Sequence, residues 1–185
     1  MYRDGHAGFN ALLYAPFVPT VTAAYSLETA LWGAVIALAA ANLPDLDQSI
    51  EQIDHRGPTH TVWFALLFGF VAGVGTVLVA RSGFGSGSFG FGFAVGTCGI
   101  LAHLAGDIVT PMGIAPFAPV SRVHVTLEWF KSKNGRINRA FLLVGSVALV
   151  ASLLLAAAQP VPIRVPVSTT GDLFRLTPTD AAASI

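Results

Sequence analysis

The chain has 185 residues, of which 54% are hydrophobic and only 11% are charged, and its formal net charge is zero. Soluble domains contain about 25% charged residues. The low charge and the mean hydropathy of +0.67 are therefore typical of a membrane protein. Zero net charge gives no electrostatic basis for binding nucleic acid. The single cysteine, Cys98, leaves no partner for an intramolecular disulfide, and its apolar neighbours favour a packing role over a nucleophilic one.

Five apolar segments follow one another along the chain. The first, residues 7–25, is interrupted by Pro16 and Pro19, which a membrane helix tolerates when its neighbours satisfy the freed carbonyl groups. A bilayer core takes about 20 apolar residues per helix. Four further segments approach or reach that length: residues 27–43, 60–80, 89–110 and 138–158. We therefore predict an all-α, polytopic membrane bundle of four to five transmembrane helices.

Polar segments rich in glycine and proline separate the apolar ones. Residues 81–88 are expected to form a short flexible turn, and residues 111–137 a longer connection. Four prolines and scattered polar residues mark the end of the chain, residues 159–185. We predict a membrane-embedded helical domain in residues 1–158, followed by an extended or disordered tail.

The polar clusters lie on one side of the membrane if every apolar segment crosses it. That side also carries most of the basic residues: Arg3, Arg56, Arg122, Lys131, Lys133, Arg136 and Arg139, against Arg81, Arg164 and Arg175 opposite. Because cytoplasmic connections are enriched in lysine and arginine, the clusters should face the cytoplasm from the inner or plasma membrane. If residues 7–25 do not cross, His6 moves to the other side and leaves the site.

His103 and Asp107 stand four residues apart near the end of one apolar segment. Residues at this spacing share a helix face, so the imidazole and the carboxylate can reach a common ion. Ionisable side chains in a membrane helix are costly and point to function. The alternative is a hydrogen bond that holds two helices together.

Asp45 and Asp47 follow the second apolar segment, which Pro44 should end. Alternation along an extended segment would turn both carboxylates to the same side, where they would repel unless a cation or a shared proton lies between them. A solvated acidic loop is the competing interpretation.

The sequence DHRGPTH supplies two further imidazoles, His55 and His60, in front of the third apolar segment. Thr59 is placed to cap that helix, and Asp54 could orient His55 from behind. Arg56 offers a guanidinium for a phosphate or a carboxylate, or else an anchor at the membrane interface. Outside this segment, His6 is a candidate ligand only through its position, whereas His124 should be solvated and Glu128 structural.

Mixed imidazole and carboxylate ligands suit zinc, with manganese and iron as alternatives, better than calcium or magnesium. The candidate ligands exceed the four positions of one zinc ion: His6, Asp45, Asp47, His55, His60, His103 and Asp107. A surplus of this kind indicates a site of two or more metals that activates water for hydrolysis. Asp47 or Asp107 would accept the proton, and Arg56 would hold the substrate anion.

The ordered motifs resemble one known family. The succession of GH, LPDLD, HRGPTH, HLAGD and TPMGIAPFAPVS over residues 1–160 is similar to the YdjM-like family of membrane-associated, metal-dependent hydrolases. That family is distantly similar to zinc-dependent phospholipases C and nucleases. The resemblance implies an all-helical fold, a multinuclear zinc site and a phosphoester substrate. It carries over to these positions: His6, Asp45, Asp47, His55, Arg56, His60, His103 and Asp107.

Two other functions remain open at this point. A transport or sensing protein would bind a divalent metal without chemistry, and its ligands would lie near the bilayer midplane. A purely structural protein would use its His–Asp pairs to pack helices, which leaves the convergence of three clusters unexplained. For the hydrolase, the bilayer is the expected partner and a small-molecule or lipid phosphoester the expected substrate.

Overall fold

The computed structural model describes residues 1–49 and 56–159. The predicted tail beyond Gln159, and the candidates Asp54 and His55, lie outside the described residues. Six α-helices follow one another: α1 (Arg3–Tyr14), α2 (Val18–Ala24), α3 (Leu27–Asn42), α4 (Val62–Arg81), α5 (Phe89–Ile108) and α6 (Gly135–Ala158). Three 3₁₀ helices join them: η1 (Ala15–Phe17), η2 (Pro44–Ser49) and η3 (Pro58–His60). The all-α prediction is confirmed.

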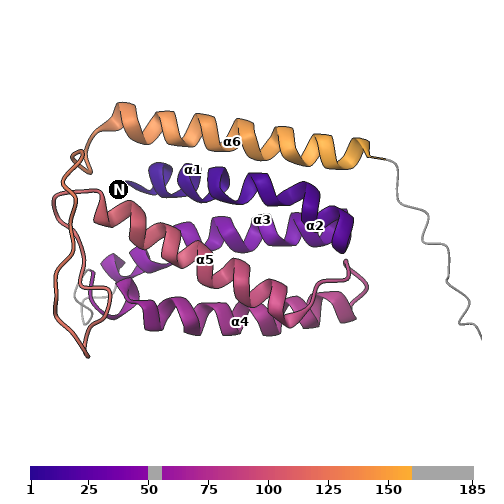
Figure 1. Cartoon of the computed structure of the whole chain (residues 1–185), viewed down its shortest axis with the longest axis horizontal. Helices are drawn as coiled ribbons and strands as arrows, with labels where there is room; N and C mark the ends of the chain where they lie inside the picture. The colour runs from indigo at the N-terminus through magenta and orange to yellow at the C-terminus, as the bar shows by residue number, and fades with distance from the viewer. Residues whose placement is uncertain (50–55, 160–185) are drawn as a thin grey trace, which may run out of the picture.

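Four helices are long and apolar enough to cross a membrane: Leu27–Gln48, Val62–Arg81, Phe89–Ile108 and Gly135–Ala158. The weaker N-terminal segment is helical as well, but η1, which contains Pro16, divides it into α1 and α2. Proline lacks the N–H group that continues a helix ladder, so the break falls where the sequence places it. In Figure 1, α1 and α2 together run the length of α3 within the bundle. Whether this segment crosses the membrane stays a prediction.

The helices lie side by side along the long axis of the molecule (Figure 1). The two most extensive pairings are α4 with α5 and α1 with α6, and α3 contacts both α1 and α5. Glycines let α1 and α6 approach closely, because a Cβ on Gly145 would collide with the backbone carbonyl of Gly8. Small residues serve this purpose in membrane helix pairs, where close van der Waals packing drives association.

Hydroxyl and amide side chains begin the long helices. Ser26, Ser88 and Asn134 accept hydrogen bonds from backbone N–H groups in the first turns of α3, α5 and α6. For α4 this cap is Thr61, whose hydroxyl accepts from the N–H of Phe64. The capping role predicted for Thr59 is wrong, because η3 occupies residues 58–60 and the helix begins only after it.

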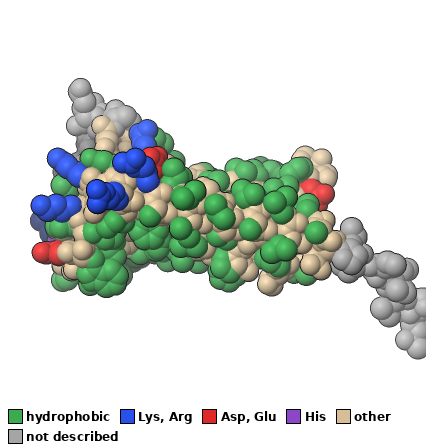
Figure 2. Space-filling view, turned by 90° about the horizontal axis from the view of Figure 1, so that it is seen from above, with side chains coloured by type: hydrophobic (Ala, Val, Ile, Leu, Met, Phe, Trp, Pro, Cys, Tyr) green, Lys and Arg blue, Asp and Glu red, His purple; other side chains and the backbone are tan. Residues whose placement is uncertain are grey.

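One end of the bundle gathers the polar parts of the chain. The N-terminus, η2, η3 and the connection 109–134 all lie there (Figure 1). An isolated antiparallel bridge between Ile114 and Val125 folds this connection, and the N–H of Val62 donates to the carbonyl of Pro116. Figure 2 shows the lysine and arginine side chains gathered at the same end, while hydrophobic side chains cover the shaft. The bundle therefore has one polar end, and the rest of its surface is largely apolar.

Candidate metal centre

Four of the predicted ligands meet in one buried group at the polar end. They are Asp45 from η2, His60 from η3, and His103 and Asp107 from α5. One ligand atom from each lies within 4.8 Å of the other three. Each residue is at most 4% exposed. The predicted convergence of separate clusters is therefore seen for these four residues.

The distances within this group fit a metal ion. The Nε2 atoms of His60 and His103 are 3.3 Å apart, and Asp107 Oδ2 lies 3.3 and 3.5 Å from them. Asp45 Oδ1 lies 3.6 and 3.9 Å from the same two nitrogens. Four ligand atoms at about 2.0–2.1 Å from a tetrahedral zinc ion are about 3.3–3.4 Å apart. The four side chains thus already stand close to a tetrahedral shell.

Outer contacts turn both imidazoles toward the group. His103 Nδ1 lies 2.8 Å from the carbonyl oxygen of Ala41. His60 Nδ1 lies 3.0 Å from the Thr59 hydroxyl and 3.3 Å from Asp47 Oδ2. An Nδ1 that donates to oxygen leaves the Nε2 lone pair as a ligand. Two such lone pairs facing each other need a proton or a cation between them.

Asp47 belongs to this outer ring rather than to the group itself. Its Oδ2 accepts hydrogen bonds from the Thr59 hydroxyl at 2.8 Å and from the backbone N–H of Arg56 at 3.1 Å. The prediction that Asp45 and Asp47 share one side of an extended segment is wrong, because residues 44–49 form a 3₁₀ helix. That turn directs Asp45 to the group and Asp47 to the far side of His60.

His6 packs against the group from α1. Its ring stacks on that of His103 with centroids 3.8 Å apart, and its Nε2 lies 3.4 Å from Asp107 Oδ1. Within the described residues neither ring nitrogen has a hydrogen-bond partner. Burial lowers the pKa of His6 to about 4, so the ring is neutral at pH 7 and free to bind a cation. A Cβ on Gly106 would come within 3.0 Å of His6 Nδ1, so the glycine of HLAGD makes room for this ring.

Arg56 contacts the group from the solvent side. Its Nη2 donates to Asp107 Oδ1 at 2.9 Å, and its Nη1 donates to the carbonyl of Gly113 at 2.8 Å. The amino group of Met1 also lies 2.6 Å from Asp107 Oδ1. Arg56 Nε is buried and has no hydrogen-bond partner among the described residues. Arg56 therefore lies beside the group, and its role in binding an anion stays a prediction.

The charge on His60 follows from its neighbours. Burial alone would lower its pKa, but hydrogen bonding to Asp107 and Asp45 outweighs burial and raises the pKa above its ordinary value. A proton held between buried carboxylates occupies the place that a divalent cation would take. Within the described residues, Asp107 Oδ2 accepts no hydrogen bond of good geometry and is buried, which also favours a cation there.

The remaining sequence candidates lie away from the group. His124 and Glu128 are both exposed, which confirms the solvated position expected for His124. The packing role expected for Cys98 is wrong, because its side chain is exposed on the bundle surface. Three contributors were missed: the amino group of Met1 and the backbone carbonyls of Ala41 and Gly113. A backbone group has no signature in the residue type, so only the fold could identify them.

Comparison with known proteins agrees with this picture. No curated protein and no solved structure matches the chain significantly. The family model described as YdjM inner membrane protein matches residues 1–167. Together with the four candidate spans, this match supports a multi-pass membrane protein. The chain belongs to the family of YdjM inner membrane proteins.

Proposed function

We propose that the chain is a membrane-bound, metal-dependent hydrolase of phosphoesters. The observation that carries the proposal is the group of Asp45, His60, His103 and Asp107, whose spacings fit a tetrahedral zinc shell. A divalent ion bound there supplies Lewis acidity, which lowers the pKa of water and offsets negative charge on a phosphoryl group. Zinc is the first choice because imidazole and carboxylate ligands suit it, with manganese and iron as alternatives.

The side chains around the group divide the remaining work in this proposal. Arg56 binds a phosphate oxygen through its unpaired Nε while Asp107 and Gly113 hold the rest of the guanidinium. Of the two expected proton acceptors, Asp107 would hold the ion through its Oδ2, which lies 3.3 Å from His60 Nε2. Asp47 is engaged by Thr59 and the backbone of Arg56 and positions His60 instead.

His6 extends the group toward a second metal position. Its Nε2 and Asp107 Oδ1 lie 3.4 Å apart on the opposite side of the Asp107 carboxylate from His60. A carboxylate that offers one oxygen to each of two ions is the usual bridge in two-metal sites. A second ion would be held by His6 and the Asp107 carboxylate, and it would take the place of the Met1 amino group at Asp107 Oδ1. His55 lies outside the described residues and stays a predicted ligand.

The orientation of the site in the membrane is part of the proposal. Among the described residues the polar end carries seven of the eight lysines and arginines, and the far end carries Arg81. This asymmetry supports a site that faces the cytoplasm. The proposal predicts that a cysteine placed at Lys133, in a Cys98→Ala background, reacts with a membrane-impermeant maleimide only in inverted vesicles. Labelling of intact cells would overturn this orientation.

The test combines metal analysis with hydrolysis by the full chain in neutral detergent. We expect bound zinc, together with turnover on a panel of phosphomonoesters and phosphodiesters. Both should be lost in a His60→Ala, Asp107→Ala double variant and kept in His124→Ala, which removes an exposed histidine near the same end. A protein that is free of metal at neutral pH, or turnover that survives the double variant, would contradict the proposal.

A second function has its own support. Four protein ligands complete a tetrahedron, as in structural zinc sites, whereas catalytic zinc usually keeps a position open. A metal-binding protein for transport or sensing is therefore the alternative. The ligands sit at the ends of helices rather than on broken helices near the middle of the bundle, which disfavours transport. Bound metal without turnover on any ester would favour sensing.

A further inference from the structure

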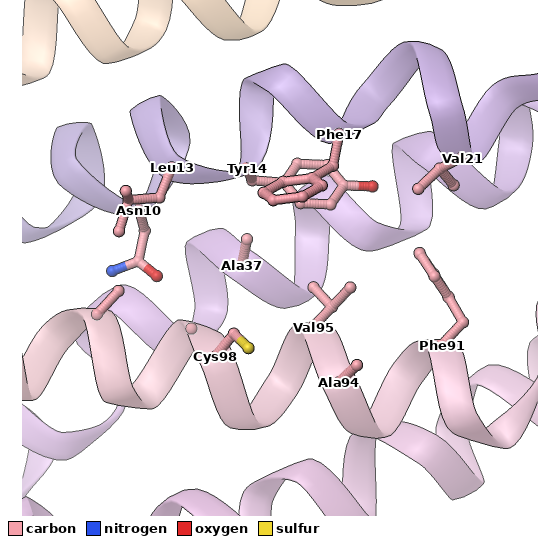
Figure 3. Close-up of a pocket in the computed structure, with 12 residues that line it drawn as sticks. Asn10, Leu13, Tyr14, Phe17, Val21, Ala37, Phe91, Ala94, Val95 and Cys98 are labelled. Atoms are coloured by element: carbon pink, nitrogen blue, oxygen red, sulfur yellow. The ribbon is translucent and has the colours of Figure 1, made fainter.

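An apolar groove opens on the side of the bundle between the N-terminal helices and α5. It has a volume of about 420 Å³. In Figure 3, Leu13, Tyr14 and Phe17 approach it from α1 and η1, and Val95 and Cys98 face them from α5. Cys98 is exposed in this groove. The groove is therefore an accessible surface within the apolar shaft rather than part of the packed core.

The walls of this groove are formed by α5, which carries His103 and Asp107, and by α1, which carries His6. On α1, Asn10 lines the groove one turn after His6, and its Nδ2 donates to the carbonyl of His6 at 3.2 Å. On α5, Ala102 lines the groove directly beside His103. The end of the groove lined by Asn10 and Ala102 is therefore the end nearer His6 and His103 along the two helices, although neither histidine lines it. The other end extends to Phe91.

The length of the groove matches one leaflet of a membrane. On α5 the lining runs from Phe91 to Ala102 inside the candidate span Phe89–Ile108. Eleven residues at 1.5 Å per residue give roughly 16 Å. Half of a hydrocarbon core that is about 30 Å thick is about 15 Å. A volume of about 420 Å³ is at the lower end of the range for small-molecule sites, roughly 300–1,000 Å³.

We propose that this groove holds one hydrocarbon chain of a lipid whose phosphate-bearing headgroup reaches the metal centre. The inference rests on the proposed function and adds its substrate class, a lipid phosphoester drawn from the surrounding leaflet. The headgroup lies at the polar end beside Arg56, and the chain follows α1 and α5 toward Phe91.

The selectivity of this binding cannot come from the hydrocarbon chain alone. Lipid chains are as apolar as the groove walls, so moving a chain from the bilayer into the groove gains little hydrophobic free energy. The phosphate at the metal centre must therefore select the ligand, while the groove selects only its shape. A chain that lacks the phosphate should occupy the groove no more than it occupies any other lipid-facing surface.

The test maps photocrosslinks from a dodecylphosphonate that carries a diazirine at the end of its chain. Its carbon–phosphorus bond resists hydrolysis, so the ligand persists during the experiment. The full chain is loaded with zinc in a neutral detergent that contains no phosphate and irradiated. We expect peptides covering residues 91–102 to be labelled at least fivefold more than the lipid-facing residues 143–155 of α6. The matching diazirine alcohol, without phosphonate, should show no such preference.

Two matched variants test whether the hydrocarbon chain of the probe lies in the groove. Ala94 is exposed on α5 and faces the groove (Figure 3), so Ala94→Phe fills the groove without entering the core. Ala151→Phe makes the same change at an exposed position of α6. The preference for residues 91–102 should be lost in the first variant and kept in the second. Equal labelling by the alcohol, or labelling that ignores Ala94→Phe, overturns the proposal.

The zinc content of the same sample distinguishes a failure of the lipid groove from a failure of the proposed hydrolase. A zinc-loaded chain without preferential labelling overturns the lipid groove and leaves the proposed hydrolase standing. A chain that takes up no zinc overturns both.

Discussion

The two ends of the bundle differ in the kind of polar side chain they bury. At the end that contains the turn 82–88, hydroxyl groups satisfy the backbone: Ser26 pairs with Thr29, and the N–H of Ser86 donates to Thr29 at 2.9 Å. At the other end imidazoles and carboxylates are buried together. Neutral hydroxyls are enough to begin helices and close a turn at the first end, so helix capping does not explain the ionisable side chains at the second. Burying them is costly in a membrane protein, and under the proposed function a bound cation would offset that cost.

The largest effect should follow from removing one ligand of the metal group. His103→Gln keeps a polar side chain of similar size but removes the imidazole, so we expect zinc affinity to fall by more than about 100-fold, beyond the range for outer contacts. Competition with a chelating dye in detergent measures the change. His124→Gln is the matched control, because His124 is exposed at the same end. If both variants bind zinc with equal affinity, His103 is not a ligand of the metal.

A smaller loss is expected when the outer ring is weakened. Asp47→Asn preserves the shape of the side chain but removes the charge that faces His60 Nδ1 at 3.3 Å. Outer partners of this kind typically contribute about 10- to 100-fold to metal affinity. The same dye competition should show a loss in this range with the zinc stoichiometry unchanged. A loss as large as that of His103→Gln would instead make Asp47 a direct ligand.

Packing of the shaft should affect stability without affecting the metal directly. In Gly145→Val, the added side chain meets the Gly8 backbone, which cannot move away cheaply. Overpacking of this kind costs about 1–3 kcal/mol. The free energy of unfolding in detergent measures it. Gly90→Val is the control, because a Cβ on Gly90 has its nearest neighbour, Ser88 Oγ, at 3.9 Å. If both variants are equally stable, α1 and α6 are farther apart than described.

The smallest effect on stability is expected at the end of the bundle that contains the turn 82–88. Ser26→Ala removes the cap that accepts from the N–H of Thr29 at 3.2 Å, and loss of such a cap costs about 1 kcal/mol. Unfolding in detergent should show this loss, while zinc affinity should not change. A change in zinc affinity would mean that the two ends are coupled through α3 and do not act independently.

Hydrophobic length was enough to predict most of the fold. The segments 27–43, 60–80 and 89–110 correspond to α3, α4 and α5 within a few residues, because long apolar runs have few alternatives to a helix in a bilayer. The spacing of His103 and Asp107 likewise placed them together on one face of α5. The local geometry of the segments between helices was harder to predict. Asp45 and Asp47 were expected on an extended segment, but they lie in a 3₁₀ helix.

The errors at Asp45 and Asp47 and at Thr59 share one physical cause. A single 3₁₀ turn rotates successive side chains away from the positions that a strand would give them, and neither composition nor period reveals such a turn over six residues. The same holds for Thr59, which η3 moves from a helix cap to a bridge between Asp47 and His60. The backbone carbonyls of Ala41 and Gly113 depend on tertiary contact alone.

X-ray absorption at the zinc edge of the loaded, full-length chain tests the central claim most directly, because it counts and identifies the ligands. The four-residue group predicts a first shell of nitrogen and oxygen atoms at about 2.0–2.2 Å. At least two of the ligands should give the outer-shell signature of imidazole, from His60 and His103. Removing both histidines should abolish that signature. A zinc ion coordinated by oxygen alone, with no imidazole contribution, would contradict the account.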